Sequence, residues 1–101
     1  MNRLLLIALF SGTVGFAGTA QAAGDAVAGK AASPSCAMCH GASGEGTKMG
    51  PKVAGMSEAA FIQAMNDYKS GKRDSPMMKS QTTQLTAADI ANLAAYYATL
   101  K

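Results

Sequence analysis

The feature that most constrains this chain is the run Cys36-Ala-Met-Cys-His40. It contains both cysteines and the only histidine of the 101 residues. Two thiols at this spacing can each bond a vinyl group of one porphyrin, which places the adjacent imidazole under the iron. The motif therefore predicts one covalently attached haem c, bound through Cys36 and Cys39, with His40 as an iron ligand.

Three other interpretations of the motif fit less well. A redox-active dithiol is typical of a βαβ context, whereas the sequence contains no strand pattern. A zinc site needs a fourth ligand, and the chain has no further Cys or His to supply it. A disulfide across so short a loop would stabilise a small domain very little.

The remaining composition also favours a bound group, because it offers little with which to build a core. Beyond residue 22 there is no Trp, one Phe (Phe61) and three Tyr (Tyr68, Tyr96 and Tyr97). Domains of this length usually need a disulfide, a metal or a bound group for stability. A haem would supply the missing apolar body.

The first 22 residues are typical of a secretory signal peptide. Arg3 precedes the apolar run Leu4–Phe10, and Ala20-Gln21-Ala22 provides small residues for cleavage. A retained membrane anchor is the weaker interpretation, because Ser, Thr and Gly interrupt the apolar stretch. We therefore expect export to the periplasm and a mature domain of residues 23–101. Loss of Arg3 leaves eight Lys or Arg against six Asp or Glu, a formal charge of +2.

Capping residues and hydrophobic periodicity predict helices only. A short Ala-rich helix covers 25–33 and stops before Pro34, a second follows the N-cap Ser57 and closes at Ser70-Gly71, and a third follows a capping box at Thr86. The apolar stripes of the last two helices are Phe61, Ile62, Met65 and Tyr68, then Ile90, Leu93, Ala94, Tyr97 and Leu100. We expect an all-α fold of three to four helices around one haem.

Glycines mark two further features. Gly29 lies inside the first helix, either because another helix crosses closely there or because the helix is simply a poor one. The segment 41–50 contains four glycines and predicts a loop. It is not a phosphate-binding loop, because Thr47 rather than Lys follows Gly46.

The segment Ser75-Pro76-Met77-Met78 fits no amphipathic period and is expected in a loop. A thioether is a soft ligand, and Met opposite His is a standard pair on the haem iron of cytochromes c. Met77 and Met78 are therefore the preferred candidates for a sixth ligand, or else both merely cover the edge of the haem. They rank above the other methionines, Met38, Met49, Met56 and Met65.

In combination, these motifs resemble the class I cytochromes c, especially the short bacterial monohaem type and the halves of dihaem cytochromes. The similarity covers nearly all of residues 24–101. It rests on Gly24-Asp25, Gly29-Lys30, Cys36–Gly41, Gly50–Gly55, Tyr68–Gly71, Leu85–Ile90 and Leu93–Tyr97. Pro34 departs from the pattern, because relatives usually run the first helix straight into the attachment motif.

The resemblance implies three residue roles. Met78, seven residues before Leu85, corresponds to the sixth ligand, with Met77 as the alternative. Pro51 corresponds to the proline whose carbonyl accepts a hydrogen bond from the ligand histidine. Gly29 corresponds to the glycine at which the first and last helices cross, against Tyr96 or Tyr97.

Two protein ligands would leave iron no position for a substrate, so we expect single-electron transfer and no enzymatic activity. The expected partners are redox proteins such as a flavoprotein or a membrane respiratory complex. We expect no nucleic-acid binding and no stable membrane insertion after cleavage. The resemblance extends to the cytochrome subunit of flavocytochrome c sulfide dehydrogenases, which gives an alternative function as a haem subunit. An open-iron sensor is a weaker third hypothesis.

Positive charges concentrate between the attachment motif and the methionine pair. They either steer an acidic partner toward the haem edge or only solvate loops, since Glu58, Asp67 and Asp74 lie among them. The residues are Lys48, Lys52, Lys69, Lys72, Arg73 and Lys79.

Overall fold

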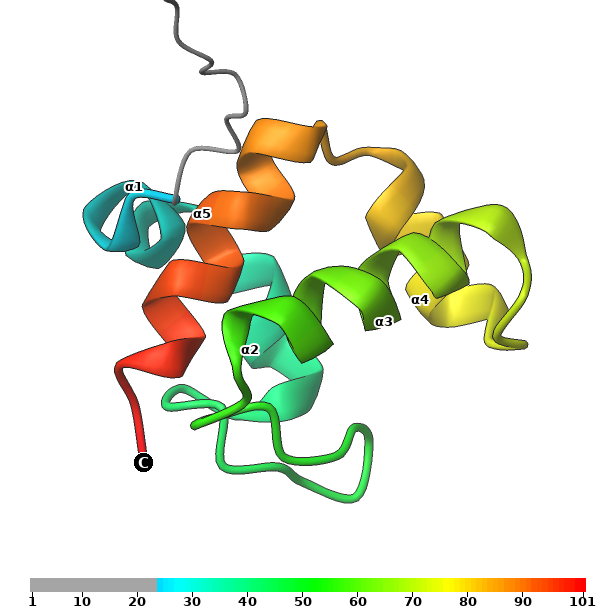
Figure 1. The fold of residues 1–101 in the computed structure, drawn as a ribbon. Helices are drawn as coiled ribbons and strands as arrows, with labels where there is room; N and C mark the ends of the chain where they lie inside the picture. Colours follow the sequence, from blue (N-terminus) through cyan, green and yellow to red (C-terminus); the bar gives the residue numbers. More distant parts are fainter. Residues whose placement is uncertain (1–23) are drawn as a thin grey trace, which may run out of the picture.

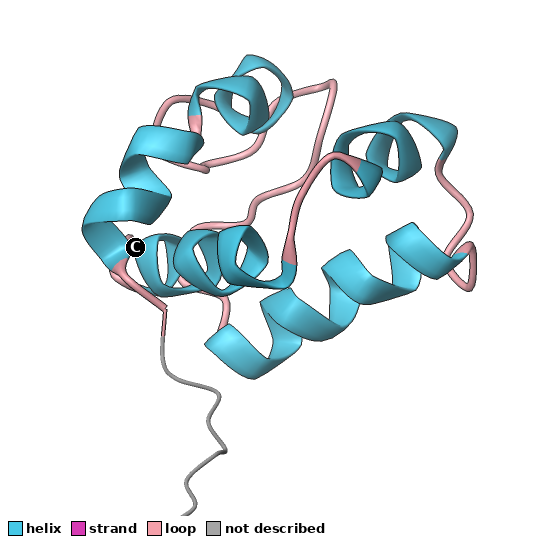
Figure 2. Cartoon of the chain, turned by 90° about the horizontal axis from the view of Figure 1, so that it is seen from above, coloured by secondary structure: helices cyan, strands magenta, loops and turns pink. Residues whose placement is uncertain are grey.

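The computed structural model describes residues 24–101, and these form five α-helices without a strand (Figures 1 and 2). The helices are α1 (Ala26–Ala32), α2 (Pro34–His40), α3 (Glu58–Ser70), α4 (Pro76–Thr83) and α5 (Ala87–Ala98). The all-α prediction is confirmed. The expected signal peptide lies outside the described residues.

The predicted starts of α3 and α5 are confirmed by their caps. The Ser57 hydroxyl accepts a hydrogen bond from the Ala60 N–H at 3.1 Å, and α3 ends at Ser70, where Gly71 follows as the C-cap with a φ of 87°. At α5, Thr86 and Asp89 form a reciprocal capping box, with each side chain accepting from the other's backbone N–H. Local sequence is thus sufficient to place these two helices.

The first helix ends at Ala32 and so stops before Pro34, as predicted, but a second helix begins directly at Pro34. Ser33 adopts the helical region, with φ −78° and ψ −14°, and Pro34 occupies the first turn of α2. Proline is tolerated there because the N–H it lacks would have no partner within the helix. The attachment motif therefore lies on a helix of its own.

The structure also corrects the expectation of a loop around the methionine pair. Ser75 caps α4 by accepting a hydrogen bond from the Met78 N–H at 3.2 Å, and Pro76 fills the first turn. Thr82 is fully buried in this helix, which fixes α4 against the rest of the domain. With α2 and α4 included, residues 24–101 contain five helices rather than three to four.

Gly29 marks a close crossing of α1 over α5. A Cβ on Gly29 would collide with the Asn92 carbonyl and with the Cβ of Tyr96. The Asp25 N–H also donates to the Asn92 side chain at 2.8 Å. The crossing explains the glycine, and Tyr96 rather than Tyr97 is the aromatic residue it contacts.

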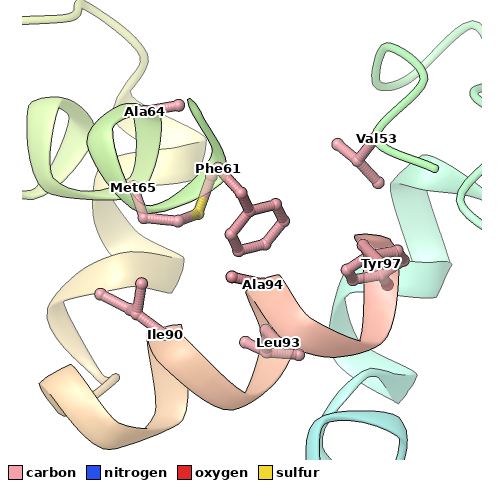
Figure 3. Packing of buried hydrophobic residues seen from close by; sticks show 8 residues of the cluster. All are labelled: Val53, Phe61, Ala64, Met65, Ile90, Leu93, Ala94 and Tyr97. Carbon is pink, nitrogen blue, oxygen red and sulfur yellow. The ribbon is translucent and has the colours of Figure 1, made fainter. Parts of the chain in front are cut away.

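The apolar stripes of α3 and α5 face each other and form a small core (Figure 3). Phe61 stacks on Tyr97 with ring centroids 5.7 Å apart. The cluster consists of Val53, Phe61, Ala64, Met65, Ile90, Leu93, Ala94 and Tyr97. Cys36 and Met78 pack against this cluster, so it supports both helices that carry candidate ligands.

From residue 24 to residue 101, no helix has the length and apolar content needed to cross a membrane.

Candidate functional site

A cavity of about 180 Å³ lies between α2, the loop that follows it, and α4. It brings together residues from distant parts of the sequence. Its walls include Cys36, Cys39 and His40 from α2, Pro51 and Tyr68 from the middle of the sequence, and Met77 and Met78 from α4. All of the predicted site residues therefore line a single cavity.

Helix α2 carries the attachment motif. Cys36 and Cys39 are half-buried free thiols, three residues apart on adjacent turns of the helix, so both reach the same cavity. Burial raises the pKa of the Cys36 thiol above its ordinary value. Both sulfur atoms therefore lie at the wall of the cavity.

The His40 imidazole is fixed from its Nδ1 side. This atom donates a hydrogen bond to the Pro51 carbonyl at 2.6 Å, as the resemblance implied. With the proton on Nδ1, the Nε2 atom keeps its lone pair and can serve as a metal ligand. His40 is buried, and a Cβ on Gly50 would lie only 2.9 Å from Nδ1, so the ring is also held sterically.

The loop from 41 to 50 lacks regular structure, as predicted, and is ordered by side chains. The Thr47 hydroxyl donates to the Cys39 carbonyl at 2.5 Å. Glu45 accepts from the Ser43 N–H at 2.9 Å, and backbone N–H groups lower the pKa of this carboxyl below its ordinary value. Gly41, Gly44 and Gly46 have positive φ values, which the tight turns of this loop require.

The two methionines of α4 differ in their surroundings. Met77 is 57% exposed, whereas Met78 is half-buried and packs against the core. The backbone of Met78 is held at both ends, because its N–H donates to Ser75 and its carbonyl accepts from the Thr82 hydroxyl at 2.8 Å. The site therefore presents one thioether that is packed against the core and one that is largely exposed to solvent.

Sequence reasoning missed several residues of this site. Ser35, Met49, Gly50 and Gln81 also line the cavity, and Thr82 supports Met78 from behind. Gly50 alone carried a signal, since its position before Pro51 was part of the resemblance. The others show no pattern in the sequence because only the fold brings them to the cavity.

The six basic residues between the attachment motif and the methionine pair differ in their contacts and exposure. The half-buried Lys69 ammonium donates to the Leu85 carbonyl at 2.5 Å, which ties α3 to the start of α5. Arg73 lies over the Tyr68 ring, 5.1 Å from its centroid. Lys48, Lys52, Lys72 and Lys79 are exposed.

The donor set fits a covalently bound haem. Cys36 and Cys39 would hold the porphyrin, while His40 and one α4 methionine would provide the imidazole and thioether that haem iron takes in electron-transfer proteins. Fold and site together define a small c-type haem domain.

Comparison with known proteins also indicates a c-type haem domain. The family described as Cytochrome c matches residues 22–101. Cytochrome c4 of Pseudomonas aeruginosa is 43% identical over 102 residues, which cover 100% of this chain and 50% of that protein. Cytochrome c-554(547) of Halothiobacillus neapolitanus is 38% identical over 91 residues, covering 78% of this chain and 100% of that protein.

A solved structure of a cytochrome has a similar fold. The crystal structure of reduced recombinant cytochrome c4 from Pseudomonas stutzeri matches with a TM-score of 0.72 and 30% identity, over 78% of this chain and 47% of that chain. The chain thus spans about half the length of the cytochrome c4 relatives it matches. The chain belongs to the cytochrome c family of electron-transfer proteins, which carry covalently bound haem c. Its single attachment motif fits one such group.

Proposed function

We propose that this chain is a periplasmic single-electron carrier with one haem c attached through Cys36 and Cys39. His40 and Met78 are the proposed axial ligands. The observation that carries this proposal is the cavity in which the attachment helix α2 and the methionines of α4 face the same space. The signal-like first 22 residues support the assignment to the periplasm.

Met78 is preferred to Met77 on packing. An iron ligand must keep its position in both oxidation states, which requires a fixed backbone and a packed side chain. Met78 has both, through its contacts with Ser75, Thr82 and the core. Met77 is largely exposed and lacks this support.

A bound haem iron of this type exchanges one electron between its ferrous and ferric states. The protein side chains would restrict the iron to this electron exchange. His40 and Met78 would fill both axial positions, so no substrate could bind iron directly. Nδ1 of His40 donates a hydrogen bond to the Pro51 carbonyl oxygen, 2.6 Å away, which keeps the imidazole in one tautomer. This arrangement suits an electron carrier rather than an enzyme.

The proposed partner is an acidic redox protein. Lys48 and Lys52 lie on the loop beside the cavity-lining residues Met49 and Pro51, and Lys79 follows Met78 directly. Exposed lysines next to the cavity raise the rate of association with a partner by attracting its negatively charged surface. Lys69 is left out of this group because its ammonium is bound to a carbonyl.

The central test is spectroscopic. An alkaline pyridine spectrum of the exported protein is expected to report one haem with two thioether links. In the ferric protein, Met78→Ala is expected to abolish the sulfur-to-iron charge-transfer band, while the matched variant Met77→Ala retains it. A colourless protein whose two thiols both react with an alkylating reagent would refute the proposal. Loss of the band in Met77→Ala alone would reassign the ligand.

A further inference from the structure

The Tyr97 hydroxyl is an unexplained polar group in the core. Tyr97 is only 1% exposed, and its hydroxyl has no hydrogen-bond partner among residues 24–101. Phe61 stacks on the ring (Figure 3). The Tyr96 ring lies 5.0 Å away, between ring centroids. A buried polar group without a partner destabilises a folded protein, so a tyrosine here needs a reason.

The ring cannot turn away from its surroundings. A Cβ on Gly44 would lie 2.9 Å from its edge, so this glycine makes room for Tyr97. Cys36 packs against the same core cluster, and its sulfur lies beside the Tyr97 hydroxyl, with the Ser33 side chain as the other polar neighbour. The Ser33 hydroxyl already donates to the Lys30 carbonyl at 2.8 Å. The Ser33 oxygen can still accept a hydrogen bond, so the tyrosine has two candidate acceptors, and of these only the Cys36 sulfur would be joined to the haem.

Attachment of haem changes the chemistry of that sulfur. A free thiol carries a proton of its own, whereas a thioether sulfur has none and can only accept a hydrogen bond. Burial raises the pKa of Tyr97, so its hydroxyl keeps its proton and remains a donor. A thiol sulfur can also accept, but in the mature protein accepting is the only role left to the Cys36 sulfur, and the Tyr97 hydroxyl is a donor beside it.

We propose that the Tyr97 hydroxyl donates a hydrogen bond to the Cys36 thioether and thereby raises the reduction potential of the haem. This inference rests on the proposed function. The O–H dipole would direct its positive end toward the porphyrin and draw electron density from the sulfur. Both effects favour the reduced state, which carries one positive charge less. Tyr97 is thus a tuning residue, because it acts through the cysteine sulfur.

The test compares the holoprotein with Tyr97→Phe, which removes one oxygen and keeps the ring. We expect a lower midpoint potential, a lower unfolding midpoint in denaturant, and a shifted C–S stretching band in the Raman spectrum. Tyr96→Phe makes the same chemical change one residue earlier, and Ser33→Ala removes the other polar neighbour. Neither control is expected to move the potential.

The results of these measurements either support the inference about Tyr97 or overturn it. An unchanged or higher potential in Tyr97→Phe, or an equal fall in Tyr96→Phe or Ser33→Ala, would overturn the inference. A higher unfolding midpoint would do the same, because it would show that the hydroxyl is unpaired in the mature protein. If Tyr97→Phe yields no holoprotein, the wild-type C–S band decides alone, and its failure to shift after exchange into D2O overturns the inference. A wild-type protein without haem would instead refute the proposed function.

Discussion

Gly50→Ala tests how tightly the structure holds the candidate axial histidine. The new Cβ would lie 2.8 Å from His40 Cε1, 2.9 Å from Nδ1 and 3.2 Å from the Cys39 carbonyl. These distances are shorter than ordinary van der Waals contacts, so the imidazole has to move. Gly50 does not adopt a positive φ, and alanine is therefore conformationally acceptable there. The cost of the substitution is steric.

The magnitude follows from three contributions. Overpacking costs about 1–3 kcal/mol. Displacement of the ring weakens the 2.6 Å bond from His40 to the Pro51 carbonyl, which is worth about 1 kcal/mol. The lower entropy of the unfolded chain offsets this by about 0.4–1 kcal/mol. We expect a net loss of about 2 kcal/mol, or about 8–16 °C in Tm for a domain of this size.

The assay combines thermal unfolding of the holoprotein with its ferric absorption spectrum. Gly71→Ala is the matched control, because Gly71 has a φ of 87° and its Cβ would meet only the Lys79 side chain at 3.7 Å. We expect Gly71→Ala to lose about 1–2 kcal/mol through backbone strain without a spectral change. Gly50→Ala should change both stability and spectrum. Wild-type stability with an unaltered spectrum in Gly50→Ala would refute the close contact between Gly50 and His40.

Two further predictions concern the helix crossing and the attachment loop. Gly29→Ala should destabilise the domain by about 1–3 kcal/mol in denaturant unfolding, because its Cβ meets the Asn92 backbone; a gain in stability would mean that Gly29 is only a poor helix residue. Glu45→Gln should destabilise the protein at pH 7. The pKa of Glu45 is lowered in the folded state, so its contribution is present above the ordinary value of 4.5 and is lost as pH falls through the folded value. Equal wild-type and Glu45→Gln stability at pH 7 would contradict the role of the Glu45 carboxylate.

Much of the fold follows from local sequence. The caps at Ser57 and Thr86 determine where α3 and α5 begin, because they satisfy backbone N–H groups through contacts three residues apart. The attachment chemistry is equally local, since Cys36, Cys39 and His40 lie on one short helix. These features need no knowledge of the remaining chain.

Tertiary structure decided the features that depend on distant contacts. Helix α4 has weak amphipathic character, and it is fixed by burial of Thr82 and by packing of Met78 against the core. Residue chemistry alone left Met77 and Met78 equivalent, and the family resemblance preferred Met78. The fold adds that Met77 is exposed whereas Met78 packs against the core.

Contacts between distant residues also determine the surroundings of the candidate ligands. The choice of Tyr96 at the Gly29 crossing, and the position of the Tyr97 hydroxyl beside Cys36, depend on how α5 is rotated against α1 and α2. Sequence determined which groups can react, because reactivity belongs to residue type and short spacing. Only the folded chain determined which groups meet, because such contacts join residues that are far apart along the sequence.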